Sequence, residues 1–273
     1  MMPFRNIRRS GRWCCIGFLI LAGLTDHALA QQQQQGPTFS DFDPAVYSQR
    51  LVRVTSEWLE NKASSPGISA EMREIQREKR DDGLWVHYHV FAKGLPKDQL
   101  YNVLQWPINA REPLILMRGV SIAADGLVIC EGRKQDQCRG EKPDDDVSFT
   151  FHPAKAEPYR LALVSIDERT KVYFGVVPDP MLAVDRDCSL EIVRLLPKFE
   201  VVMLRGKGFT PNSDLAFSGS SYGEAHGGSI KSDSHGKIVS GLLPFVTGKQ
   251  SGTTDFTVKD ASCAPKLSFE WGR

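Results

Sequence analysis

The feature that most constrains the fold of this chain is a series of short apolar segments, each closed by glycine, proline or aspartate. The segments include "LWVHYHVFA", "YRLALVSI", "KVYFGVV" and "KLSFEW". Each has the length of one strand, and in the last of them Leu267, Phe269 and Trp271 alternate with polar residues, which gives the strand one apolar face. Because no long helical segments separate them, the strands predict a mainly β fold of antiparallel sandwiches or barrels and not a parallel sheet.

One helix is predicted ahead of the strands, in residues 43–65. Asp43 is a favourable N-cap, Pro44 suits the first helical position, and "SSPG" ends the helix. Apolar residues recur at helical spacing at Tyr47, Leu51, Val54 and Trp58. The next segment, "EMREIQREKR", could form a helical turn or a strand. Asp82-Gly83, directly before "LWVHYHVFA", favours a hairpin.

The segment "PDPMLAVDRD" is predicted to be a linker, because Pro178 and Pro180 interrupt regular structure. It divides the strands into a first β-sandwich domain at 68–180 and a second at 187–273. About 240 residues after an N-terminal leader suit one large domain or two domains of roughly 100 residues each.

Residues 1–30 have the layout of a secretory signal peptide. A basic segment, "MMPFRNIRRSGR", precedes the apolar "WCCIGFLILAGL", and "ALA" forms a small-residue cleavage site after Ala30. A Sec-type signal predicts a secreted or periplasmic protein. Residues 31–42 are predicted to be a disordered polar tether, and no later segment is apolar enough for a membrane helix.

The formal net charge of +1 provides no electrostatic footprint for nucleic acid. The expected partner is an extracytoplasmic protein or glycan, with no nucleic acid, no integral membrane segment in the mature chain and no cofactor.

Four cysteines remain after the leader, namely Cys130, Cys138, Cys188 and Cys263. An even number in an exported chain favours disulfides over metal ligands or catalytic thiols. The pairs Cys130–Cys138 and Cys188–Cys263 are predicted because each lies within one predicted domain. Pairing between the domains is the alternative.

The glycine-lysine loop "RGKGFTPNS" is not predicted to hold a phosphate. It lacks the spacing of a phosphate-binding loop, and no helix follows it. Gly206 and Gly208 allow a bulge or positive φ, Phe209 is expected to enter the core, and Pro211-Asn212 to form a turn.

"GSSYG" matches the Gly-x-Ser-x-Gly pattern of a nucleophile elbow at Ser221, with Asp233 and His235 following in the order used by α/β-hydrolases. An elbow needs a strand that leads into a helix, but a glycine-rich segment without helical period follows here. A turn is therefore favoured over a serine nucleophile.

"HYH" is the strongest metal candidate. On a strand, His87 and His89 point to the same face, as two ligands of one ion would. Trp85 and Phe91 share that face, so the imidazoles can also simply lie among aromatic rings. A third ligand, His152 or an acid, is only a guess.

Two further groups are interpreted structurally. The acidic segment Lys142–Asp146 lacks the alternating spacing of a calcium loop and is expected to be a solvated loop. Glu224, His226 and His235 are interpreted as turn residues.

The second half resembles uncharacterised secreted bacterial proteins with immunoglobulin-like β-sandwich domains. The resemblance covers about residues 176–273 and rests on "VVPDP", "CSLEIVRLLP", "RGKGFTPNSDLAF", "LLPFVTGKQSG" and the cysteine before "LSFEWG". It implies a sandwich fold and export, but no ligand. Together with the residue patterns above, the predicted fold class is mainly β, an N-terminal helix followed by two antiparallel immunoglobulin-like β-sandwich domains. The Cys–Trp–Cys spacing of antibody domains is absent.

The function predicted from these features is a non-enzymatic exported binding or structural module that presents sandwich loops to a protein, glycan or envelope partner. The alternative is a metal-dependent or serine hydrolase that uses His87 and His89, or Ser221 with His235.

Overall fold

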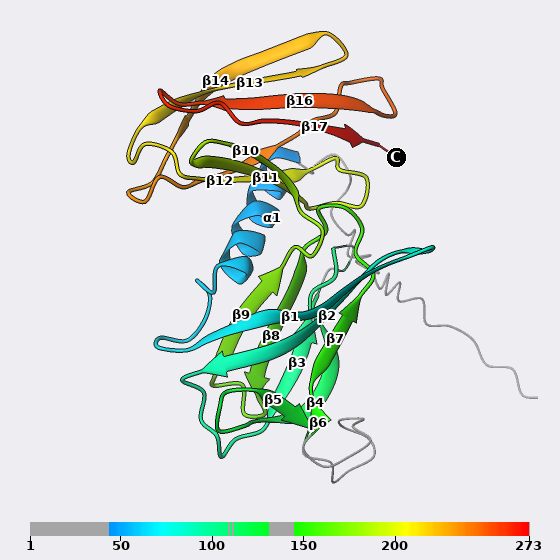
Figure 1. Cartoon of the computed structure of the whole chain (residues 1–273), viewed down its shortest axis with the longest axis vertical. Coiled ribbons are helices and arrows are strands. Elements are labelled where there is room, and N and C mark those ends of the chain that lie inside the picture. Colours follow the sequence, from blue (N-terminus) through cyan, green and yellow to red (C-terminus); the bar gives the residue numbers. More distant parts are fainter. Residues whose placement is uncertain (1–43, 109, 111, 131–144, 273) are drawn as a thin grey trace, which may run out of the picture. The chain divides into compact units, whose positions relative to one another are not determined.

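The described residues of the computed structural model contain one helix and four antiparallel sheets (Figure 1). These residues are 44–108, 110, 112–130 and 145–272. The mainly β fold predicted from the sequence is confirmed. No helix in these ranges is long and apolar enough to cross a membrane.

The first part of the chain forms the helix and two sheets. The helix is α1 (Pro44–Leu59). The three-stranded sheet has the order β1 (Ser69–Arg80), β2 (Gly83–Lys93), β7 (Ser148–Phe151). The six-stranded sheet has the order β6 (Asp145–Asp146), β5 (Val128–Cys130), β4 (Leu114–Ile122), β3 (Tyr101–Gln105), β8 (Tyr159–Ser165), β9 (Lys171–Val176).

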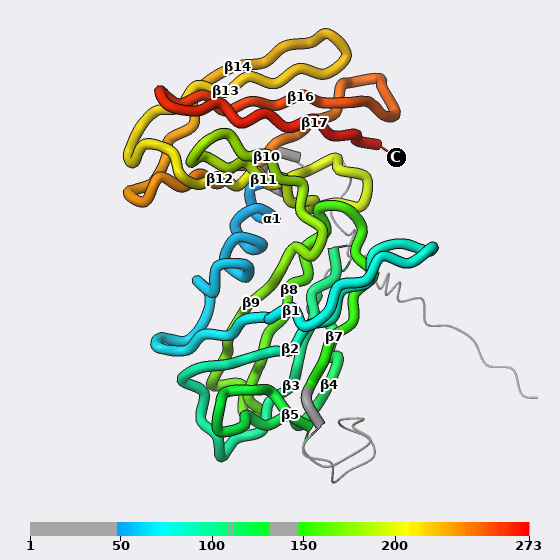
Figure 2. The backbone as a smooth tube through the Cα atoms, viewed as in Figure 1, coloured from blue at the N-terminus to red at the C-terminus, as the bar shows by residue number. Residues whose placement is uncertain are grey.

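The second part forms two four-stranded sheets, which appear in yellow-green to red in Figure 2. One has the order β10 (Met181–Asp185), β11 (Cys188–Arg194), β12 (Val202–Lys207), β15 (Ile238–Leu242). The other has the order β14 (Glu224–Lys231), β13 (Asp214–Ser221), β16 (Gly252–Lys259), β17 (Lys266–Trp271).

Two large hydrophobic clusters follow this division. One contains residues of both early sheets, such as Val86 and Leu161, and the other contains residues of both late sheets, such as Leu190 and Phe256. Alternate residues along the strands are buried, as a sheet packed on one face requires. The described residues nevertheless belong to one compact unit, Asp43–Arg273, so the domain boundaries 68–180 and 187–273 stay a prediction.

Helix α1 ends in a left-handed cap at Asn61, whose φ is 58°. The amide of Lys62 donates to the carbonyl of Glu57 at 2.9 Å, which is the wide hydrogen bond of a Schellman motif. The side-chain oxygen of Asn61 also accepts from the amide of Ala70 at 3.3 Å, which ties the helix end to the start of β1. The predicted helix region, 43–65, thus includes this cap and the turn after it.

The hairpin predicted at Asp82-Gly83 is confirmed, because β1 and β2 pair antiparallel from Arg80↔Gly83 outward. The strand is not regular throughout, since the register shifts between Glu74 and Gln76.

Two local predictions are wrong. The expected linker at 178–187 contains strand β10, which pairs with β11 through a tight turn in which Arg186 has a φ of 55°. Its apolar alternation, "MLAVD", was outweighed in the sequence by the flanking prolines and charges. Glu224 and His226 are not turn residues but begin strand β14, because the turn precedes them at Tyr222-Gly223.

Candidate functional site

The paired histidines lie on the same face of β2, as their spacing predicted, and this face is the solvent side of the three-stranded sheet. They are half-buried and alternate along β2 with the buried Val86, Tyr88 and Val90. His87 Nδ1 lies 2.9 Å from the Thr150 hydroxyl, and His87 Nε2 is buried without a hydrogen-bond partner.

The aromatic neighbours of the histidines are covered by arginines from β1. The guanidinium of Arg73 lies 3.9 Å from the ring centre of Phe91, and that of Arg80 lies 5.0 Å from the ring of Trp85. Cation–π contacts of this kind stabilise a strand pair. This face is therefore well explained as packing.

On the inner side of the same sheet, Glu74, Arg77 and Tyr88 are linked by hydrogen bonds. The hydrogen bond from Arg77 lowers the pKa of the Glu74 carboxyl. Burial, with the Glu74 charge second, raises the pKa of Tyr88 to about 12, so this phenol stays protonated at neutral pH.

The guessed third metal ligand, His152, is engaged elsewhere. Its Nε2 lies 2.8 Å from the carbonyl oxygen of Asp82, and its ring packs against Trp85 with centroids 5.0 Å apart. Within the described ranges, only Cys188, Asp260 and Cys263 bring three metal-type ligand atoms within 4.8 Å of one another. The histidines are not in that group.

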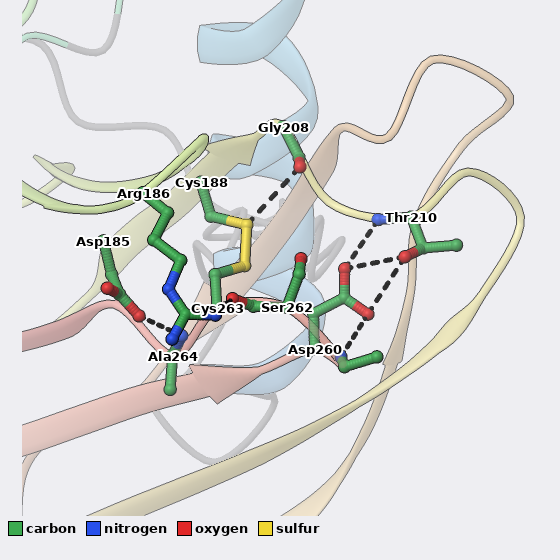
Figure 3. Close-up of a disulfide and its surroundings, with 10 residues drawn as sticks. Asp185, Arg186, Cys188, Gly208, Thr210, Asp260, Ser262, Cys263 and Ala264 are labelled. Carbon is green, nitrogen blue, oxygen red and sulfur yellow. Dashed lines mark hydrogen bonds between the residues drawn. A yellow bond between two sulfur atoms is a disulfide. The ribbon is translucent and has the colours of Figure 1, made fainter.

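That group is built around a disulfide (Figure 3). Cys188 and Cys263 are joined, with their Cα atoms 6.2 Å apart, as the sequence predicted. Two bonded sulfurs offer no thiolate to a metal, because the thiolate is the metal ligand. Cys130 is also a disulfide cysteine, but Cys138 lies outside the described residues, so the pair Cys130–Cys138 stays a prediction.

The Asp260 carboxylate fixes the loop beside the disulfide (Figure 3). It accepts from the Thr210 amide at 2.7 Å and from the Ala261 amide at 2.7 Å. The hydrogen bond from the Thr210 amide is the main reason that the pKa of Asp260 lies below its usual value.

The glycine-lysine loop turns the chain as expected. Gly208 has a φ of 84°, Asn212 has a φ of 53°, and Phe209 is buried in the core. A Cβ on Gly208 would lie 1.9 Å from the Asp187 carbonyl oxygen, so the position needs glycine for space as well as for conformation.

Ser221 is a structural residue. It is buried, its hydroxyl donates to the Thr253 carbonyl at 3.1 Å, and the Trp271 indole donates to it at 3.2 Å. "GSSYG" is a hairpin turn in which Tyr222 and Gly223 both have positive φ, as a type I′ turn requires.

The expected partners of Ser221 lie at the other end of the hairpin. Asp233 and His235 follow Lys231, the last residue of β14, whereas Ser221 pairs with Glu224, the first. Seven strand steps separate the two ends, about 23 Å. Ser221 and His235 therefore do not form the nucleophile–base pair of a serine hydrolase. The Asp233 carboxylate instead accepts from the amides of Lys237 and His235, which hold its pKa below the usual value.

The acidic segment Lys142–Asp146 falls outside the residues whose side chains the structure describes.

A concave surface lies on the four-stranded sheet that contains β10. Helix α1 packs on one part of this sheet, where Val193 and Met203 are fully buried in a cluster with Val52. Val193 is paired with Met203, and Met203 with Gly241, so these residues form one row across the sheet.

The next row on the same face is open. It runs Leu182–Glu191–Arg205–Val239 by strand pairing, and the row beyond it begins with Val184. The apolar members are exposed: Leu182 by 53%, Val184 by 64% and Val239 by 38%. We call this surface the open face.

Charges on the open face are paired at its centre. Arg205 Nη2 lies 2.9 and 2.8 Å from the two carboxylate oxygens of Glu191. Around them is a depression of about 720 Å³, which Asp187, Lys207 and Lys237 also line. The surface thus has apolar side chains, a neutralised centre and a charged rim.

The sequence did not reveal this surface. The alternation in "MLAVD" could have indicated a strand, but exposure depends on how far α1 reaches across the sheet, which no local pattern encodes.

Comparison with known proteins assigns no family, because no protein-family model and no curated protein matches the chain. One similar solved structure is a DUF3823 family protein from Bacteroides ovatus ATCC 8483, with 8% sequence identity and a TM-score of 0.20, over 76% of this chain and 99% of that one. Another comes from work on host cell surface retention of a 1.5-MDa bacterial ice-binding adhesin, with 10% identity and a TM-score of 0.19, over 76% of this chain and 64% of that one. Likeness at these TM-scores carries no argument about function.

Proposed function

We propose that the chain is an exported, non-enzymatic binding module that docks a protein partner of the cell envelope or its surroundings on the open face. In this proposal the four sheets form two immunoglobulin-like sandwiches, residues 1–30 direct export, and the rigid sheets hold the binding surface in place. The observation that supports it most is the row of exposed aliphatic side chains beside the neutralised Glu191–Arg205 pair.

The composition of the open face favours a protein partner. Protein interfaces combine an apolar centre with a polar rim, and charged residues are depleted at their core. Glu191 and Arg205 already satisfy each other through two hydrogen bonds, so a partner that covers them leaves neither charge unpaired. Leu182 and Val184 supply apolar area that is at present in contact with water.

The sequence alone pointed to loops at the sandwich ends as the presenting surface. Loop presentation and a glycan or envelope partner stay predictions, and the open face is the surface with the stronger structural support. The separation of Ser221 from His235 argues against a serine hydrolase. Among the described residues, a metal-dependent hydrolase would have only His87 and His89 as candidate ligands.

A capture experiment tests the proposal. Tagged mature protein is incubated with the cell envelope fraction and with culture fluid, and the retained proteins are compared with those retained by Leu182→Lys/Val184→Lys. The matched control is Ile75→Lys, because Ile75 is also 53% exposed but lies on β1.

We expect one or more proteins to be retained by the wild type and the control and lost in the open-face variant. Equal capture by all three proteins would show that the open face is not the docking surface. Stoichiometric bound metal that is lost in His87→Ala/His89→Ala would instead support the hydrolase.

A further inference from the structure

A second concave surface lies on the outer side of the six-stranded sheet, where α1 runs beside β9 (Figure 1). It is a groove of about 500 Å³, within the range typical of small-molecule sites. Its lining includes three aromatic rings and three charged side chains: Trp58, Trp106, Tyr173, Glu57, Glu168 and Lys171. We call it the aromatic groove.

The rings form one continuous wall. Trp58 packs edge-on against Trp106, with centroids 5.6 Å apart, and tilted against Tyr173 at 4.7 Å. Trp58 is buried, whereas Trp106 and Tyr173 keep part of their surface exposed to the groove. Leu104 and Val164 add apolar lining from the sheet.

The polar groups of the aromatic groove are free to bind. Among the described residues, the carboxylates of Glu57 and Glu168, the ammonium of Lys171 and the hydroxyl of Tyr173 form no hydrogen bond or ion pair. One groove therefore offers acceptors, donors and an apolar wall together.

We propose that the aromatic groove binds a short, uncharged oligosaccharide. A sugar ring has an apolar C–H face that can pack on an aromatic ring, and hydroxyls at its edge that can donate to carboxylates and accept from an ammonium or phenol. It is the ligand class that uses both the wall and the mixed charges.

Other ligand classes fit less well. Two carboxylates against one ammonium disfavour a phosphate or another anion. Lys171 disfavours a cation, and the Trp106 ring already has the Arg160 guanidinium 5.0 Å from its centre. A purely apolar ligand would leave all three charged groups desolvated and unpaired.

The inference goes beyond the proposed function, and either can fail alone because the two surfaces lie on different sheets. The test is isothermal titration of the mature protein with cellotetraose, chitotetraose and maltotetraose. Variants are Tyr173→Ala, which removes part of the wall, and Glu168→Gln and Lys171→Ala, which alter rim groups outside the packed core. The matched control is Tyr222→Ala, which removes an exposed tyrosine from the turn between β13 and β14.

We expect at least one of the three oligosaccharides to bind, and its Kd to rise roughly tenfold or more in Tyr173→Ala, equivalent to about 1.4 kcal/mol. A smaller rise is expected in the two rim variants, and none in Tyr222→Ala or in the open-face variant Leu182→Lys/Val184→Lys. Thermal melting verifies that each variant is folded. If none of the three sugars binds, or if the rim variants and a folded Tyr173→Ala bind like the wild type, the aromatic groove is not a saccharide site.

Discussion

Removal of the Cys188–Cys263 disulfide is expected to destabilise the second half of the chain strongly. The bond joins residues 75 apart in sequence, from the first residue of β11 to the connection before β17. In the chain-entropy treatment, closing such a loop restricts the unfolded chain enough to stabilise the fold by about 4 kcal/mol. Both cysteines are buried in the hydrophobic cluster of the late sheets, so the change also removes packing contacts.

The perturbation is the double variant Cys188→Ala/Cys263→Ala, and the assay is urea unfolding at neutral pH followed by far-ultraviolet circular dichroism. With a denaturant slope of about 2 kcal/mol per molar, the midpoint of the affected transition should fall by roughly 2 M. The matched comparison is Cys130→Ala/Cys138→Ala, because the predicted loop of about 8 residues should contribute only about 2.5 kcal/mol.

A loss below about 1 kcal/mol in the first variant would refute the reasoning. It would mean that the unfolded chain is already restricted between these positions, or that the native bond does not form in the exported protein. An equal loss in both variants would contradict the dependence on loop length.

Three further outcomes are expected. Arg160→Met should lower the free energy of unfolding, measured by urea titration, by roughly 3 kcal/mol. The buried guanidinium donates to the Thr55 hydroxyl and to the carbonyls of Trp106 and Pro107, and the variant leaves these acceptors without it. An unchanged urea midpoint would contradict this. The pKa of the Asp260 carboxyl is lower in the folded chain than its usual value of 3.8. The ionised carboxylate therefore stabilises the fold at pH values above 3.8, and this stability is lost as the pH falls through the lowered pKa. Asp260→Asn should therefore be less stable at neutral pH but lose less stability in acid, and parallel pH profiles would contradict it. Mass spectrometry of the exported protein should find Gln31 at the N-terminus, whereas an intact Met1 would sink the signal-peptide prediction.

Many of the strands and turns could be predicted because their signals are local. Asp82-Gly83 marks a hairpin, Leu267, Phe269 and Trp271 show an apolar face, and Gly208 supplies a positive φ. Strand β10 was missed because the prolines and charges that flank it are as typical of a linker as of an edge strand.

The candidate sites depend on long-range contacts that local patterns do not contain. The role of Ser221 is decided by Trp271, 50 residues away, whose indole donates to its hydroxyl. The aromatic groove combines Trp58 of α1, Trp106 directly after β3, and Tyr173 of β9. No spacing rule connects them, so the sequence predicted neither this groove nor the open face.

The most direct test of the proposed function is photo-crosslinking from the open face in cells that export the protein. A photoreactive amino acid replaces Val184 in one variant and Ile75 in another, since both side chains are exposed but only Val184 lies on the open face. We predict a discrete crosslinked protein adduct from position 184 and none of that size from position 75. The same adduct from both positions, or no adduct from position 184, would contradict docking on the open face.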